Sequence, residues 1–204
     1  LRYPGSHNPR PPLMSLKSFF FINRSYTPIP IVIALLYFSK IEEIYFPIGL
    51  FLILLGELIR IYSVRYAGGK TRTRNVGASS LCTAGPYSRT RNPLYIGNML
   101  IYIGIVFFSG GSLMWEFLFI VIVFFSIQYY FIIQLEEKKL LELFQDEYIN
   151  YQKNVPAIVP NINPWPGSVI KTPYSLLQTL KTEKRTLQNI IFIIIFIVIK
   201  SVLI

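Results

Sequence analysis

The sequence predicts an all-α polytopic membrane protein with about five transmembrane helices joined by loops on the cytoplasmic side. The 204 residues are 52% hydrophobic, and their mean hydropathy is +0.47. Only 15% of them are charged, against roughly 25% in soluble domains, so an ordinary soluble enzyme is excluded. The chain also holds 16 Phe and 14 Tyr, which is too much apolar bulk for a disordered protein.

Each expected helix corresponds to a run of residues without charge. In chain order the runs are 25–39, 44–56, 92–115, 117–135 and 186–199. A helix needs roughly 20 residues to cross the bilayer core, so the third and fourth runs are long enough. The second run is long enough if Glu57 and Arg60 are tolerated, because its apolar pattern continues to Tyr62. The first and last runs are short. A Ser-Gly-Gly-Ser turn at 109–112 separates the third helix from the fourth.

The distribution of basic residues predicts the orientation of these helices. With the N-terminus and the Arg-rich loop in the cytoplasm, 18 of the 20 Lys and Arg residues lie on that side. Lys40 and Lys200 are the two exceptions. The net charge of +10 therefore reports topology and contact with anionic lipid headgroups, and we expect no nucleic-acid partner.

The chain divides into a leader and one membrane domain. Residues 1–24 form a basic leader without the apolar core of a signal peptide, and part of it could be foreign to the natural chain, with Met14 as the natural start. Residues 25–204 form a single membrane domain with two polar segments, 66–91 and 136–166. The second opens with a helix, and that helix is expected to end at Val155-Pro156. Its expected apolar face consists of Leu140, Leu141, Phe144, Tyr148 and Tyr151.

Scarce residue types exclude several chemistries. One His, in the leader, and one Asp make a Ser-His-Asp triad or a metal centre implausible, so no metal is expected. Cys82 is the single cysteine, and we expect it to be unreactive because no base stands near it in the sequence. A G-x-G-x-x-G motif is absent, which argues against a Rossmann domain.

Two motifs stand at predicted membrane boundaries. Residues 84–97 read AGPYSRTRNPLYIG, and residues 136–156 read EEKKLLELFQDEYINYQKNVP. Together they resemble the integral-membrane methyltransferases of the isoprenylcysteine carboxyl methyltransferase and phospholipid methyltransferase superfamily. That family shows G-x-Y, then R-H/N-P-x-Y-x-G, and later E-E, F-x-x-E-Y-x-x-Y and V-P. The resemblance covers about residues 60–160, and the helix at about 186–204 is additional to it.

The resemblance implies methyl transfer from S-adenosylmethionine, bound by cytoplasmic loops, to a lipophilic acceptor in the membrane. That acceptor would be an isoprenylcysteine-like carboxylate, a lipid amine or a small thiol. By similarity, the cofactor-binding residues are Ser79, Ser80, Leu81, Cys82, Tyr87, Asn92, Pro93, Leu94, Tyr95 and Glu136. A carboxylate and aromatic faces suit a ligand with a cationic sulfonium. The oligomeric state is left open.

Catalytic and substrate-binding roles follow from the same resemblance. Glu136, Glu137 and Arg91 are the catalytic candidates, and a glutamate would act as base if the acceptor were an amine. The substrate candidates are Glu57 and Ile132. The protein-methylating branch carries an arginine at the position of Ile132, so an isoprenylcysteine carboxylate is less favoured here.

Other interpretations of these residues remain open. Arg89 and Arg91 could simply set topology, and Tyr87 and Tyr95 could be interfacial aromatics. Pro93 could begin the third helix. Glu136 and Glu137 could pair with the following lysines, and Glu57 with Arg60.

Two alternative functions are an NADPH-dependent membrane reductase of the sterol-reductase type and a non-enzymatic membrane scaffold. In the reductase, basic loop residues would hold the 2′-phosphate, namely Arg72, Arg74, Arg89 and Arg91. A scaffold would have no reason to carry the two motifs. A transporter is disfavoured, because the third and fourth helices offer few polar residues beyond Asn98, Ser126 and Gln128.

Overall fold

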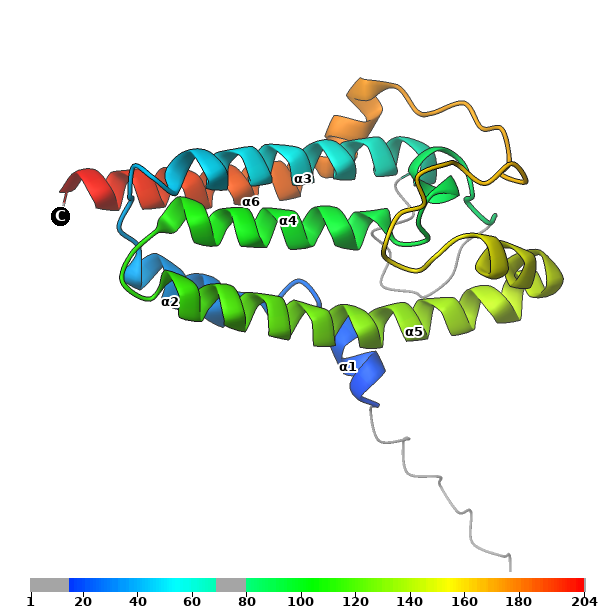
Figure 1. Ribbon diagram of the computed structural model, residues 1–204, viewed down its shortest axis with the longest axis horizontal. Helices are drawn as coiled ribbons and strands as arrows, with labels where there is room; N and C mark the ends of the chain where they lie inside the picture. The colour runs from blue at the N-terminus through cyan, green and yellow to red at the C-terminus, as the bar shows by residue number, and fades with distance from the viewer. Residues whose placement is uncertain (1–14, 69–79, 204) are drawn as a thin grey trace, which may run out of the picture.

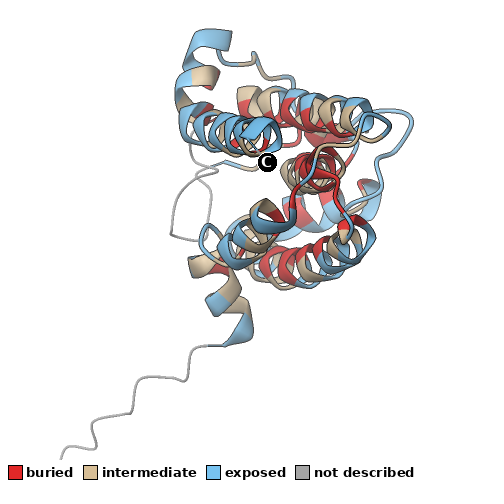
Figure 2. Ribbon diagram, turned by 90° about the vertical axis from the view of Figure 1, so that its left-hand side faces the viewer, coloured by how far each residue is buried: buried red, intermediate tan, exposed pale blue. Residues whose placement is uncertain are grey.

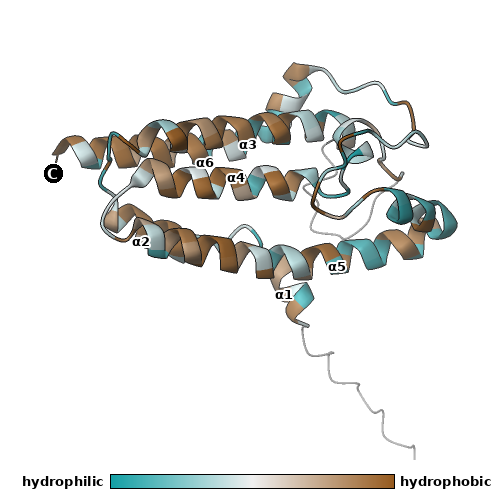
Figure 3. Ribbon diagram, viewed as in Figure 1, coloured by the Kyte–Doolittle hydropathy of each residue, from teal (hydrophilic) through white to brown (hydrophobic). Residues whose placement is uncertain are grey.

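The computed structural model describes residues 15–68 and 80–203, and the regular structure in these ranges is helical. The helices are α1 (Leu16–Asn23), α2 (Ile29–Phe38), α3 (Phe46–Ala67), α4 (Pro93–Ser109), α5 (Met114–Asn154) and α6 (Leu176–Leu203), with a 3₁₀ turn, η2, at Gly85–Ser88. The long helices lie side by side (Figure 1), and the hydrophilic residues gather toward one end of the molecule (Figure 3). The predicted all-α class is confirmed.

Three of these helices, α3, α5 and α6, are long and apolar enough to cross a membrane. Apolar residues cover most of their length, as Figure 3 shows. The other two apolar helices are shorter: α4 has 17 residues, about 25 Å of helix, and α2 has 10, about 15 Å. The first predicted run begins at residue 25, but α2 starts only at Ile29, with Pro28 at its N-cap and Pro30 in its first turn, where proline is tolerated in a helix.

Helices α3 and α4 approach each other closely through glycines. A Cβ atom added at Gly49 would lie 2.3 Å from the backbone nitrogen of Phe108, and one added at Gly56 would lie 2.6 Å from the carbonyl oxygen of Gly97. Both distances are too short for any side chain. Small residues allow such backbone contact between membrane helices, where packing rather than hydrophobic burial drives association.

Helix α5 is longer than the sequence indicated. The helix of the run at 117–135 continues without a break past Glu136, so the helix expected at the start of the polar segment is present as an extension of the membrane helix. A kink at Gln145 (φ 40°) turns the end of α5 back. Beyond it, Tyr148, Tyr151 and Val155 form a buried cluster. Leu141 is 41% exposed and lies outside that cluster, contrary to the prediction.

Two further helical segments differ from expectation. Part of the leader forms α1, which packs on α5 through parallel rings of Phe20 and Phe131 at a centroid distance of 5.7 Å. Helix α6 begins ten residues before the predicted run at 186, because its first turns are amphipathic rather than apolar. Buried residues collect on the facing sides of the helices, while the outer faces stay exposed (Figure 2).

Candidate functional site

The two boundary motifs meet where α4 begins and α5 leaves the apolar region. Pro93 opens α4, as the alternative reading of this residue predicted, and places Tyr95 in its first turn. The Tyr95 hydroxyl donates to a carboxylate oxygen of Glu136 at 3.0 Å. The Glu136 side chain is half-buried, with 30% of its surface exposed. Two predicted cofactor residues, 41 positions apart in sequence, are thus brought together.

Sequence reasoning missed two neighbours of Glu136. Arg24, at the end of α1, places its guanidinium 3.6 Å from the second oxygen of Glu136. The ring of Tyr129 stacks on Tyr95 with centroids 4.7 Å apart. A signal for Tyr129 was available, because it stands seven residues before Glu136 and so on the same helix face. Arg24 carried no such signal, since its position depends on how α1 packs against α5.

The Glu137 carboxylate is held by Arg91. Both Nε and Nη2 of Arg91 lie 2.8 Å from the same Glu137 oxygen. Nη1 of Arg91 donates to the carbonyl oxygens of Gln152, at 3.2 Å, and Val155. The guanidinium therefore ties the motif before α4 to both ends of the second motif. The alternative of a Glu137 pair with a following lysine is not the arrangement found.

The Pro-rich segment after α5 is fastened to the first motif. The Asn92 side chain donates to the carbonyl of Ala157 at 3.1 Å, and the Thr90 hydroxyl lies 3.1 Å from the same oxygen. Arg89 donates to the Ile162 carbonyl, and its own carbonyl accepts from the Asn161 amide at 2.8 Å. The amide of Asn92 thus points at protein backbone rather than at open space.

Tyr87 and Cys82 form the inner side of the loop. Tyr87 is buried, and its carbonyl accepts a hydrogen bond from the Tyr151 hydroxyl at 2.7 Å, so the alternative of an interfacial belt residue is wrong for Tyr87. Burial raises the pKa of the Tyr87 phenol well above its ordinary value. Burial also raises the pKa of the half-buried Cys82 thiol, although Lys171 opposes this, so the thiol stays protonated near neutral pH.

The remaining loop candidates take different positions. Leu81 packs on the buried Tyr148 cluster, Ser80 is exposed, and Leu94 is half-buried. Ser79 lies outside the described residues, as do Arg72 and Arg74 of the reductase alternative. Ile132 is fully buried in the core, one turn before Glu136 on the same side of α5.

A family model for phospholipid methyltransferases matches residues 44–147, from the residues just before α3 to the far part of α5. The match covers half of the chain and includes Tyr95, Glu136 and the Arg91–Glu137 pair. The chain belongs to the phospholipid methyltransferase family. With three helices long enough to cross a bilayer, this member is an integral membrane protein. The superfamily indicated by the two motifs is confirmed.

Two curated relatives are similar over the same region. The chain is 30% identical to methanethiol S-methyltransferase of Pseudomonas deceptionensis over 110 residues, which are 53% of this chain and 39% of that protein. It is 32% identical to protein-S-isoprenylcysteine O-methyltransferase of Saccharomyces cerevisiae over 121 residues, 56% of this chain and 48% of the relative. The chain thus spans less than half the length of each. No solved structure matches.

A second polar cluster lies deeper, between α3, α4 and α6. The predicted pair of Glu57 and Arg60 is confirmed, with Arg60 Nε 3.7 Å from the carboxylate. Arg60 also donates to Asn98 and, at 2.5 Å, to Glu183. All three charged residues are buried. Glu183 was missed because the last helix was expected to begin only at about residue 186.

Proposed function

We propose that this protein transfers a methyl group from S-adenosylmethionine to a lipophilic acceptor at the membrane boundary. One observation supports this most directly: the Tyr95 hydroxyl donates a hydrogen bond to the Glu136 carboxylate, which brings the two motifs of the family into contact. Both curated relatives carry names of methyltransferases, one acting on sulfur and one on oxygen.

The residues around Glu136 fit this cofactor. S-adenosylmethionine is cationic at its sulfonium and its amino group, and the half-buried Glu136 carboxylate can accept from or neutralise such a group. The rings of Tyr95 and Tyr129 stack beside this carboxylate, and aromatic faces attract cations. What the cofactor supplies when bound is an electrophilic methyl carbon. The remaining predicted walls are residues 79–82, Tyr87 and residues 92–94.

The residues of this chain then have distinct roles. Glu136 binds the cationic ligand, and Tyr95 orients the carboxylate through its hydrogen bond. Arg91 is better assigned to positioning than to catalysis, because its donors are occupied by Glu137 and two backbone carbonyls. Transfer by in-line displacement depends chiefly on alignment within a site that excludes water.

The acceptor decides whether a base is needed. A carboxylate or thiolate attacks as an anion, whereas an amine must lose a proton, which Glu136 or Glu137 would take. Carboxylate and thiol acceptors are supported by the printed names of the relatives, and Glu57 remains a substrate candidate beside Arg60. We infer that the cofactor enters from the cytoplasm and the acceptor laterally from the bilayer.

The membrane reductase is the second candidate function, and calorimetry separates the two. We expect the purified protein in detergent to bind S-adenosylhomocysteine at micromolar affinity and NADPH not at all. The Glu136→Gln variant should bind at least tenfold more weakly. A matched control is Glu142→Gln, since Glu142 is an exposed carboxylate on the same helix.

One result would refute the proposed reaction, and another would refute only the role of Glu136. Absence of S-adenosylhomocysteine binding by the unaltered protein refutes methyl transfer. Equal affinity in Glu136→Gln and in the unaltered protein removes Glu136 from the site. Transfer of a labelled methyl group to a panel of lipid amines, thiols and prenylated carboxylates would then identify the acceptor.

A further inference from the structure

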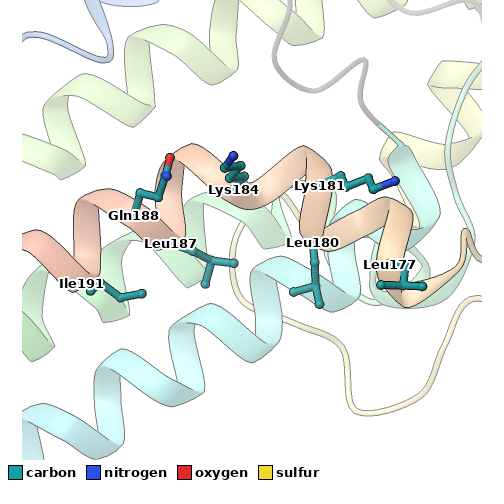
Figure 4. Close-up of a pocket in the computed structure, with 7 residues that line it drawn as sticks. All are labelled: Leu177, Leu180, Lys181, Lys184, Leu187, Gln188 and Ile191. Atoms are coloured by element: carbon teal, nitrogen blue, oxygen red, sulfur yellow. The ribbon is translucent and has the colours of Figure 1, made fainter.

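A shallow groove of about 310 Å³ runs along the outer face of α6. Its walls are the apolar side chains of Leu177, Leu180, Leu187 and Ile191, and Lys181 and Lys184 stand along its edge. Figure 4 shows the lysines projecting along one edge of this face of the helix, and Leu180 and Leu187 along the other edge. Only 11% of the apolar window of α6 is buried inside the protein, so this helix faces its surroundings.

The ion pair between Glu183 and Arg60 fixes the rotation of α6 about its axis. Glu183 is fully buried and points at α3. Successive residues of a helix are turned by about 100°, so Lys181 and Arg185 lie on nearly the opposite side from Glu183. One inward carboxylate therefore directs the neighbouring cations outward.

The outward cations are close together along α6. Lys181, Lys184 and Arg185 are exposed, and they lie within five residues. Within the described residues, 15–68 and 80–203, none of the three has a carboxylate within ion-pair distance. Three clustered cations beside an apolar surface match a ligand that has an anionic head and an apolar tail.

The position of the three cations along α6 would bring the anionic head of such a ligand to the membrane surface. The 14 uncharged residues at 186–199 cover about 21 Å of helix, less than the bilayer core of about 30 Å. Lysines at such a boundary extend toward the headgroups. From Lys184 to Ile191 the groove continues for about 10 Å, which is within the depth of one leaflet.

We propose that this groove binds one anionic phospholipid in the leaflet on the side of the polar loops. Its phosphate contacts Lys181 and Lys184, and an acyl chain lies along Leu187 and Ile191. A groove confined to one leaflet suits a lipid better than a second transmembrane helix. The site is separate from the Glu136 carboxylate, so lipid binding does not depend on the proposed methyl transfer.

Native mass spectrometry of the full chain tests the proposal. The protein is given equal amounts of phosphatidylglycerol and phosphatidylcholine, and bound lipids are counted for the unaltered protein and for Lys181→Gln/Lys184→Gln. Loss of both lysines should weaken phosphatidylglycerol binding about 30-fold, which corresponds to about 2 kcal/mol. The matched control is Lys138→Gln/Lys153→Gln, two exposed lysines at the polar end of α5.

The expected result is a preference for phosphatidylglycerol that the test variant loses and the control retains. Both variants should keep the melting temperature of the unaltered protein in lipid-free detergent. Equal binding of the two lipids, or equal loss in both variants, would overturn the proposal. A change of oligomeric mass in the test variant would assign the groove to a second copy of the chain and overturn it as well.

Discussion

The buried ion pair of Arg60 and Glu183 should couple α3 to α6 far more strongly than an exposed pair does. Replacing Arg60 by Met leaves Glu183, which is fully buried, without the guanidinium that lies 2.5 Å away. Breaking one side of a buried pair costs about 3–5 kcal/mol, because a charge is left in a poorly solvated place. Replacing Glu183 by Leu removes that charge, so part of the cost should be recovered in the double variant.

A double-mutant cycle measures this coupling. Arg60→Met, Glu183→Leu and their combination are unfolded in detergent, and we expect a coupling free energy of about 1–3 kcal/mol. The chain offers a matched control in Lys139 and Glu142, an exposed pair at 3.0 Å, whose cycle should give about 0.5 kcal/mol or less. A coupling no larger than that of the control would show that packing alone holds α6, and would refute the reasoning.

Three other predictions follow from the same structure. Gly49→Ala should destabilise the protein by about 1–3 kcal/mol, seen as a lower melting temperature, because the new methyl group would meet the Phe108 backbone at 2.3 Å; an unchanged melting temperature would disprove that close approach. Cys82 should react slowly with a maleimide at pH 7 and faster as the pH rises, since its raised pKa keeps the nucleophilic thiolate scarce at neutral pH; a rate equal to that of free cysteine would contradict this. Tyr95→Phe should weaken S-adenosylhomocysteine binding about tenfold, as measured by calorimetry. The reason is that Glu136 loses a hydrogen bond worth about 1.5 kcal/mol. An unchanged affinity would show that this hydrogen bond does not contribute to binding.

The sequence predicted the parts of the fold that depend on local pattern. Uncharged runs located the apolar helices, and the two motifs named Tyr95 and Glu136, which the structure places in contact. Features that depend on packing between distant segments were not predicted. The contact of Arg24 with Glu136 requires the docking of α1, and that of Glu183 with Arg60 joins residues 123 positions apart. Neither the hydropathy pattern nor the helical period of the sequence predicts which distant residues will be in contact.

The continuity of α5 has a consequence for how the bilayer itself acts on this protein. From Met114 to Glu136 the helix rises about 33 Å, slightly more than the apolar thickness of a typical bilayer. Glu136 therefore sits at the height where an upright α5 leaves the hydrocarbon. A thinner or thicker membrane makes such a helix tilt, and that raises or lowers the carboxylate against the headgroup plane. The thickness of the membrane therefore affects the position of the Glu136 carboxylate, in addition to the residues around it.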